Sequence, residues 1–375
     1  MADATPRRVL FSGYAPVRFV CFLPVYQELA KDPRVEVWFS GGFRCEAEDG
    51  QLSYELAGFY DPFPVNRERV ISYERSREED FDVLVCSHLS DGLFPRSIKR
   101  SVQIFHGVSF KNLAVREKAL RFDYLCLPGR YHGELYRREG LVRAGGSQCL
   151  LTGMPKADAL VGPADRGALL RRYGLDESLP TVLFAPTGEK HNALEVMGKE
   201  VIAAIAQSGK LNLLVKPHDH PKKAIDWFAE LAPYARGRVR LVRDLDVVPY
   251  LRIADALMTD ASSVAFEYTL VDRPIVFLDT PKLFKQVAKR APALDLQTYG
   301  RNIGVVVEKP EDVVGQLEHS LAHPEEQRPL RRAAAEHIFH RPGQASARVA
   351  GVVLHAAGLL PALPPGIDVL APEAA

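Results

Sequence analysis

The sequence predicts an α/β fold made of two successive domains, each with a parallel sheet covered by helices. The chain has 375 residues, which is long for one hydrophobic core and sufficient for two domains. Short apolar runs alternate with helical patterns, as is typical of parallel sheets. This alternation restarts after residue 160, which indicates two Rossmann-like domains facing a central cleft.

The first half opens with a strand pattern at 8–12 and a helical pattern at 17–31. That helix is expected to end before Asp32-Pro33, because proline disfavours helical geometry in the residue before it. Residues 45–79 show little periodicity and predict no element. The strands predicted in this half are 8–12, 35–40, 81–87, 101–105, 124–127 and 148–151.

The second half starts with a helix at 165–173, for which Asp165 is a suitable N-cap. Its predicted strands are 181–185, 212–216, 239–242, 256–259, 274–278 and 303–307. Helical patterns follow at 310–321, 329–339 and 345–357. We expect domains at 1–160 and 161–343, a helix at 344–358 that could cross back to the first domain, and a disordered tail at 359–375.

The composition is that of an ordinary globular protein, with a formal net charge of +1 and no overall signal for nucleic acid. Residues 96–143 hold eleven Lys and Arg against four acids, which could favour a polyanion or an anionic membrane surface. A solvated helical face explains the same excess. The five cysteines form no C-x-x-C pair, and neither a signal-peptide core nor a membrane-length apolar run is present. We therefore expect a cytoplasmic protein with at most peripheral membrane contact.

Polar clusters follow several predicted strands, at the edge where open parallel sheets bind ligands. One such cluster would be a weak signal, but five at the same edge are hard to explain by packing. They are His106-Gly107, the segment from Gly153 to Asp158, Pro186-Thr187-Gly188, Lys216-Pro217-His218 and the segment from Asp260 to Ser263.

The segment from Asp260 to Ser263 joins a buried strand to a helix. Backbone N–H groups at the start of that helix, its dipole and the two serine hydroxyls could bind a phosphate without a metal. The alternative is that the serines merely cap the helix. Glu267, one turn further on, could accept hydrogen bonds from ribose hydroxyls or complement the helix dipole.

His106 and His218 are the acid–base candidates, one in each half and each just past a strand. Gly107 would let a ligand approach the backbone closely. The alternative for each histidine is a structural role. The sequence lacks Walker A, G-x-G-x-x-G, G-x-S-x-G, H-E-x-x-H and strand-end D-x-D motifs, so we predict no cofactor and no metal site.

In their order, these elements resemble the CDP-glycerol glycerophosphotransferase family, the teichoic acid primases and polymerases. The likeness covers about residues 80–350 and includes Gly343-x-Ala345-Ser346-x-Arg348. It implies a GT-B fold whose N-terminal domain binds the acceptor and whose C-terminal domain binds the nucleotide donor. It also implies metal-independent transfer of a glycerol phosphate or related polyol phosphate from CDP to a hydroxyl group. The chain departs from the family pattern at Val108, Gly188-Glu189 and Ala261.

The resemblance also implies roles for individual residues. His106 matches the proposed base, and His218 matches the histidine near the donor diphosphate. The residues expected to bind the donor phosphates are Ser262, Ser263, Lys216, Asp260 and Thr187; those expected at the nucleotide or ribose are Glu267 and Pro186; and those expected on the acceptor side are Gly107, Lys111 and Asp158.

The expected partners are a CDP-alditol donor and a hydroxyl acceptor that could be lipid-linked, with residues 96–143 touching the inner face of the cell membrane. Two other functions fit the same sequence. One is a GT-B glycosyltransferase or UDP-sugar 2-epimerase, and the other is a nucleotide-binding module without catalysis, to which the departure at Gly188-Glu189 points.

Overall fold

The computed structural model describes residues 5–46, 50–89, 94–146, 148–163, 165–218, 225–291 and 293–372. The chain divides into two compact units. The first unit comprises residues 1–106, 114–158 and 338–375, and the second comprises residues 107–113 and 159–337. Unlike the predicted domains, the second unit therefore includes a short segment from the first half of the sequence.

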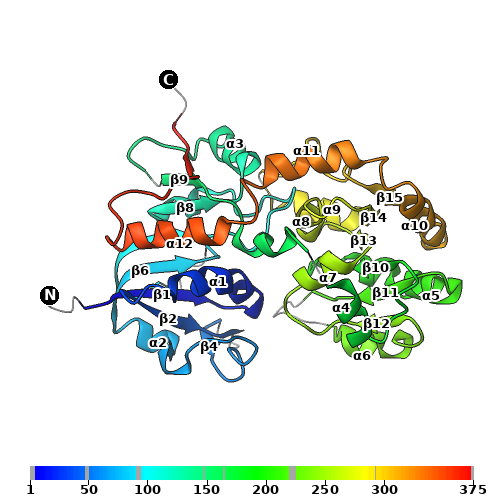
Figure 1. Cartoon of the computed structure of the whole chain (residues 1–375), viewed down its shortest axis with the longest axis horizontal. Coiled ribbons are helices and arrows are strands. Elements are labelled where there is room, and N and C mark those ends of the chain that lie inside the picture. Colours follow the sequence, from blue (N-terminus) through cyan, green and yellow to red (C-terminus); the bar gives the residue numbers. More distant parts are fainter. Residues whose placement is uncertain are drawn as a thin grey trace. The chain divides into compact units, whose positions relative to one another are not determined.

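An eight-stranded sheet forms the centre of the first unit (Figure 1). Its strands are β1 (Arg7–Gly13), β2 (Val35–Gly41), β5 (Val70–Ile71), β6 (Asp80–Cys86), β7 (Ser97–Gln103), β8 (Tyr124–Leu127), β9 (Gln148–Leu151) and β16 (Asp368–Val369). They lie in the order β16-β9-β8-β7-β6-β1-β2-β5, and all pair in parallel except β16 with β9. The six strands predicted in this half are all present.

Two shorter features of the first unit differ from the sequence expectation. The segment without periodicity contains a two-stranded antiparallel ribbon of β3 (Phe43–Glu46) and β4 (Leu52–Glu55). The prediction of a disordered tail at 359–375 is wrong for the described part of that tail, because β16 pairs with the edge strand β9. Residues 373–375 lie outside the described residues.

Helices cover the sheet of the first unit. They are α1 (Pro16–Leu29), α2 (Tyr73–Ser76), α3 (Arg130–Arg138) and α12 (Ala345–Ala356). Helix α1 has proline at its first position, which needs no hydrogen-bonded N–H there, and it buries Phe19 and Phe22. It packs beside α12, so the last helix of the chain belongs to the N-terminal sheet (Figure 1).

Asp158 fixes the start of α12 across a long stretch of sequence. Its carboxylate accepts hydrogen bonds from the backbone N–H groups of Gly343 (2.9 Å), Ala345 (2.9 Å) and Ser346 (2.7 Å), and from the Ser346 hydroxyl (2.7 Å). This is N-capping by a residue outside the helix, and it uses both carboxylate oxygens.

Arg348 and Gly153 complete the attachment of α12. Arg348 donates to the carbonyl oxygens of Thr152 (2.7 Å) and His340 (3.1 Å). Gly153 has a φ of +86°, and a Cβ there would lie 2.6 Å from the His340 carbonyl oxygen. The segments around Gly153 and Ser346, which carry part of the family resemblance, therefore bind each other.

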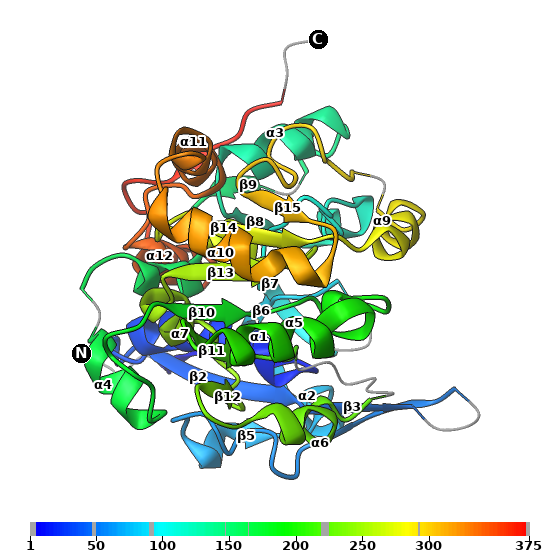
Figure 2. The same cartoon turned by 90° about the vertical axis from the view of Figure 1, so that its right-hand side faces the viewer.

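The second unit has a six-stranded, fully parallel sheet. Its strands are β10 (Thr181–Phe184), β11 (Asn212–Val215), β12 (Val239–Leu241), β13 (Ala256–Thr259), β14 (Ile275–Leu278) and β15 (Val305–Val307). Figure 2 shows them in the order β12-β11-β10-β13-β14-β15. This is the Rossmann order, and all six predicted strands are confirmed.

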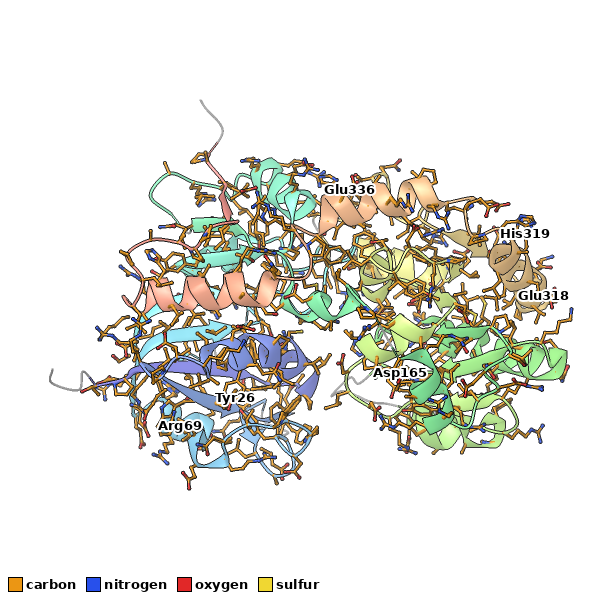
Figure 3. All side chains as sticks on the ribbon, viewed as in Figure 1. Tyr26, Arg69, Asp165, Glu318, His319 and Glu336 are labelled. Carbon is orange, nitrogen blue, oxygen red and sulfur yellow. The ribbon has the colours of Figure 1, made fainter. Side chains whose placement is uncertain are left out.

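One helix of the second unit, α4 (Arg166–Arg172), precedes β10 in the chain, and the others lie between or after the strands. These others are α5 (Lys199–Ser208), α6 (Trp227–Leu231), α7 (Val248–Ile253), α8 (Val264–Tyr268), α9 (Pro281–Ala288), α10 (Val313–Ala322) and α11 (Arg328–Ile338). Asp165 caps α4 as predicted, accepting from the Ala168 N–H at 2.9 Å (Figure 3). A π-helical turn, Leu194–Gly198, leads into α5.

The first prediction concerns the cap of α12. Asp158→Ala should lower the free energy of unfolding by about 1–3 kcal/mol, because it leaves backbone donors without their acceptor. Chemical denaturation followed by circular dichroism measures this. The matched control is Asp165→Ala, which removes one hydrogen bond at an exposed helix start and should cost less. Equal losses in the two variants would contradict this account of Asp158.

The second prediction concerns His132 on α3, which is buried against Phe105 with ring centres 5.0 Å apart. Burial lowers the pKa of His132 to about 4. Above its unfolded pKa of about 6.5, His132 is neutral in both states; below it, the unfolded chain binds a proton that the folded chain refuses. The free energy of unfolding should therefore fall by up to about 3 kcal/mol between pH 6.5 and 4.

Denaturant unfolding at pH 7.5 and pH 4.5 tests the His132 prediction. His132→Leu should reduce the difference in unfolding free energy between the two pH values, because the titrating group is gone. The carboxylates and the other histidines contribute alike in both proteins. An unchanged difference in His132→Leu would show that His132 titrates normally.

Candidate active site

The strand order of the second unit reverses between β10 and β13. From β10 the chain builds outward through β11 and β12, and then returns to build the other side from β13. Ligands of open α/β sheets bind at such a switch point, beyond the carboxyl ends of the strands. Thr187 follows β10, and the segment from Asp260 to Ser263 follows β13. The sheet thus brings two of the predicted clusters together.

Asp260 joins these loops by its buried carboxylate, which is fully shielded from solvent. One oxygen accepts the Thr187 N–H at 2.8 Å, and the other accepts the Ala193 N–H at 2.9 Å. Burial raises the pKa of Asp260, and the backbone hydrogen bonds and the charge of Lys111 oppose that rise. The Asp260 carboxylate thus holds the two loops together, and its predicted place at the donor phosphates stays a prediction.

Lys111 reaches the same place from the segment 107–113. It is buried, and its Nζ donates to the Thr187 hydroxyl at 3.0 Å. Burial lowers the pKa of Lys111, while the carboxylates of Glu189 and Asp260 act against the shift. Lys111 was expected on the acceptor side, but it lies in the second unit with the residues predicted to bind the donor.

The segment 107–113 is anchored in the second unit by its neighbouring side chains. Phe110 stacks on Phe284 with ring centres 5.8 Å apart and also contacts Phe266. The Asn112 side chain donates to the Ala293 carbonyl oxygen at 2.9 Å. Asn112 has a positive φ of 46°, a conformation that asparagine tolerates better than most residues. These contacts hold Lys111 in place.

Ser262 and Ser263 lie at the start of α8, and Ser263 forms no side-chain cap hydrogen bond. The alternative in which its hydroxyl merely caps the helix is therefore wrong for Ser263. Gly107 approaches this residue so closely that a Cβ at position 107 would lie 2.8 Å from the Ser263 Oγ. Gly107, which was also expected on the acceptor side, thus belongs to this cluster.

The remaining donor-side candidates occupy the same unit. Pro186 precedes Thr187 after β10, and Glu267 is fully buried in α8. Lys216 is buried just after β11, where its N–H donates to the Phe184 carbonyl oxygen at 2.9 Å. His218 is exposed in the loop that follows.

The first unit has a switch point of its own, between β1 and β6. Tyr14 and Arg18 follow β1, and Ser87 and His88 follow β6. Arg18 donates to the Tyr14 hydroxyl at 2.8 Å and to the Ser87 carbonyl oxygen. His88 is buried, which lowers its pKa well below the usual range, and the charge of Arg18 lowers it further.

His106 joins this cluster from the end of β7. Its side chain is exposed, and its Nδ1 lies 3.1 Å from the Ser87 carbonyl oxygen. Arg18 Nη1, which only donates, lies 3.3 Å from the same Nδ1, so the two contacts require opposite tautomers of His106. In the tautomer that donates to Ser87, the lone pair of the neutral ring is on Nε2, as a general base needs.

Asp158 holds the start of α12, and its predicted place on the acceptor side stays a prediction. Some functional candidates were missed by the sequence analysis. Tyr14 and Arg18 were not predicted, although the strand-end rule applied to the first strand would have indicated them. The inclusion of Lys111 in the second unit had no signal in the periodicity of the sequence.

Metal-ligand clusters and membrane-spanning helices are both absent from the described residues. Within the described ranges, no group of three or more His, Cys, Asp or Glu side chains is placed to hold a metal ion. No helix in the described part of the chain is long and apolar enough to cross a membrane.

The third prediction concerns Asp260. Asp260→Asn should lower the free energy of unfolding by about 1–3 kcal/mol, because an amide offers one oxygen where two backbone N–H groups need acceptors. Denaturant unfolding measures this. The control is Asp279→Asn, which alters the partly exposed ion pair with Arg301 and should cost at most about 1 kcal/mol. A harmless Asp260→Asn would contradict the assigned role.

Known proteins resemble this chain in sequence and in fold. A teichoic acid glycerol-phosphate primase from Bacillus spizizenii is 26% identical over 190 residues, covering 49% of this chain and 44% of the relative. A teichoic acid poly(glycerol phosphate) polymerase from Staphylococcus epidermidis is 26% identical over 207 residues, covering 47% of this chain and 28% of the relative. The matches thus span less than half of either relative.

Solved structures share the fold over nearly the whole chain. A variant of the wall teichoic acid polymerase TagF, soaked with CDPG, has a TM-score of 0.67 at 17% identity and covers 96% of this chain and 90% of that chain. A putative UDP-N-acetylglucosamine 2-epimerase from Listeria monocytogenes has a TM-score of 0.58 at 14% identity and covers 94% of this chain and 97% of that chain. At such identities the likeness establishes the fold alone, which is GT-B.

A family model distinguishes the likeness to the teichoic acid enzymes from the likeness to the epimerase. The model described as CDP-glycerol:poly(glycerophosphate) glycerophosphotransferase matches residues 82–355, well over half of the chain. That range contains the clusters at His106, Lys111, Thr187, Lys216 and Asp260 to Ser263. The chain therefore belongs to the CDP-glycerol:poly(glycerophosphate) glycerophosphotransferase family.

Proposed function

We propose that this protein transfers a polyol phosphate, in the first instance glycerol phosphate, from a CDP-activated donor to a hydroxyl acceptor during synthesis of a cell-surface polymer. Family membership supports the reaction class. The observation that carries the proposal for this chain is the cluster at the switch point of the second unit. There, the hydroxyls of Thr187 and Ser263 lie with the buried cation Lys111 on loops held by Asp260.

In this proposal the donor diphosphate binds at that cluster. The Ser262 and Ser263 hydroxyls and the Thr187 hydroxyl donate to phosphate oxygens, and the cations Lys111 and Lys216 offset their charge. His218 lies in the loop after the neighbouring strand and assists the departing phosphate. Asp260 acts indirectly, by holding the loops, and Glu267 and Pro186 contribute to the nucleotide side.

The chemical step balances without a further reactant. His106 Nε2 takes the proton from the acceptor hydroxyl as its oxygen bonds to the phosphorus that carries the polyol. The bond from this phosphorus to the bridging oxygen breaks, and CMP leaves with the electron pair. In this proposal the neutral ring donates from Nδ1 to the Ser87 carbonyl oxygen, so that Nε2 is the basic atom.

The acceptor and the location belong to the same proposal. A lipid-linked acceptor would bring the protein to the inner face of the cell membrane through the basic residues of 96–143. Several of these are already engaged: Lys111 is buried, and Lys99 and Arg143 pair with Asp82 and Glu117. The exposed positive charge is thus smaller than the sequence count indicates, so the proposed membrane contact is weak and peripheral.

The fourth prediction concerns His106. His106→Ala should reduce CMP release from CDP-glycerol or CDP-ribitol by about 10²–10⁴-fold, because the hydroxyl loses its general base. The affinity of the His106→Ala variant for the CDP donor should stay within about twofold of the wild-type affinity. The matched control is His319→Ala on α10 (Figure 3), whose imidazole pairs with Glu326 at the surface and should leave turnover unchanged.

The same assay decides between the candidate functions. The purified protein is offered CDP-glycerol, CDP-ribitol and UDP-sugars with polyol and polyol-phosphate acceptors, and nucleotide products are separated by chromatography. CMP from a CDP-alditol supports the proposal. UDP release, or epimerisation of a UDP-HexNAc, would replace it with the glycosyltransferase or epimerase alternative, and tight CDP binding without turnover would indicate a non-catalytic module.

A further inference from the structure

Arg18 occupies the switch point of the first unit with neutral partners. It lies in the first turn of α1, directly after β1. Its guanidinium donates to the Tyr14 hydroxyl and the Ser87 carbonyl oxygen and lies 4.4 Å from the centre of the Tyr14 ring. These contacts fix the orientation of the cation but do not neutralise its charge.

In the described part of the chain, no carboxylate forms an ion pair with Arg18. The groups that act on it electrostatically are Tyr14, Cys21 and Cys86, which are neutral at neutral pH. Its Nε is buried, and no hydrogen-bond acceptor among the described residues meets it. Burial lowers the pKa of Arg18, but a guanidinium keeps its proton at neutral pH. The side chain is partly buried, and a cation that is partly shielded from water is unfavourable unless a counter-charge meets it.

Arg331 shows how a buried arginine is usually stabilised, by an ion pair with a carboxylate. Its side chain is almost fully buried, like the Nε of Arg18, and it pairs with the Asp272 carboxylate at 3.3 Å. Arg18 instead has cationic neighbours. Arg121 acts with Arg18 on the buried His88, and the Arg44 guanidinium lies 5.9 Å from the Tyr14 ring. Arg44 pairs with Glu46 at 3.9 Å, so the positive charge that favours an anionic ligand here is that of Arg18 itself.

The position of Arg18 indicates what kind of anion it would bind. Its Nη1 lies 3.3 Å from His106 Nδ1, so an anion bound by Arg18 would be close to the proposed base. A guanidinium matches the oxygens of a phosphate and can donate two parallel hydrogen bonds to it. Arg18 also lies outside residues 82–355, so the family match says nothing about it.

The family's description names a poly(glycerophosphate), and we propose that Arg18 is the residue that binds the acceptor by the phosphate group nearest its reacting hydroxyl. In glycerol phosphate, a few bonds separate the hydroxyl from the phosphate, which matches the proximity of Arg18 to His106. This inference rests on the proposed function for its role in catalysis. The donor phosphate offers the same chemistry, and the experiments below separate the two sources.

A binding experiment tests Arg18 without any turnover. The full-length protein is labelled with ¹³C in its histidine rings and titrated with glycerol 3-phosphate or, as a neutral control, with glycerol. The His106 signal, identified with His106→Ala, should shift saturably with glycerol 3-phosphate and not with glycerol. Arg18→Gln should weaken this binding at least about 10-fold, because it removes the charge and the paired donors.

Two further variants keep the binding experiment decisive. Arg18→Lys retains the charge and should bind glycerol 3-phosphate with an intermediate affinity, even if Arg18→Gln fails to fold. Arg69→Gln, in the same unit, removes an arginine that is paired with Glu36 at 3.1 Å and should bind like the wild type (Figure 3). No shift in the wild type, or equal affinity in Arg18→Lys and the wild type, would overturn the proposal.

Steady-state kinetics distinguishes acceptor phosphate from donor phosphate. Arg18→Lys should raise the KM for a phosphate-bearing acceptor about 10-fold, with the KM for the CDP donor and the KM for glycerol as acceptor unchanged. A rise in the donor KM instead would place the donor phosphate at Arg18 and overturn the proposal. If the wild type releases no CMP from any CDP-alditol, the proposed function fails, while the binding experiment still decides whether Arg18 binds a phosphate.

Discussion

The buried carboxylate of Asp260 is the constraint on which the second unit depends. Two loops that follow different elements must meet beyond the ends of β10 and β13, and each has a backbone N–H that needs an acceptor. A carboxylate supplies both acceptors from one side chain. Because it is fully buried, it also makes a nearby cation favourable, and Lys111 supplies it. The positions of the Thr187 hydroxyl and of the loop that carries Ser262 and Ser263 follow from this pair.

The two units use the same topology with opposite charge at the switch point. In the second unit a buried anion organises the loops, and its charge is balanced within the protein. In the first unit a partly buried cation, Arg18, donates to two neutral groups, the Tyr14 hydroxyl and the Ser87 carbonyl oxygen. We propose that the balanced charge of Asp260 belongs to the framework, whereas Arg18 is free to bind a substrate.

The strand pattern and the strand-end clusters were predictable, because buried parallel strands read as short apolar runs and the site residues directly follow them. Asp165 was predictable for the same local reason. The roles of Asp158 and Asp260 were not, since both act on backbone groups brought together by the fold, and a carboxylate at a strand end looks the same in either role. The placement of Lys111 depends on Phe110 and Asn112 packing against distant residues, which no local pattern encodes.

The segment 107–113 has a consequence for engineering. The second unit cannot be excised as the continuous stretch 159–337, because such a fragment would lack Phe110 and Lys111 and expose the faces of Phe266 and Phe284. A chimera that exchanges the C-terminal half with a relative must also exchange this heptapeptide. Any change of sequence in the second unit therefore has to be compatible with a segment encoded directly after His106.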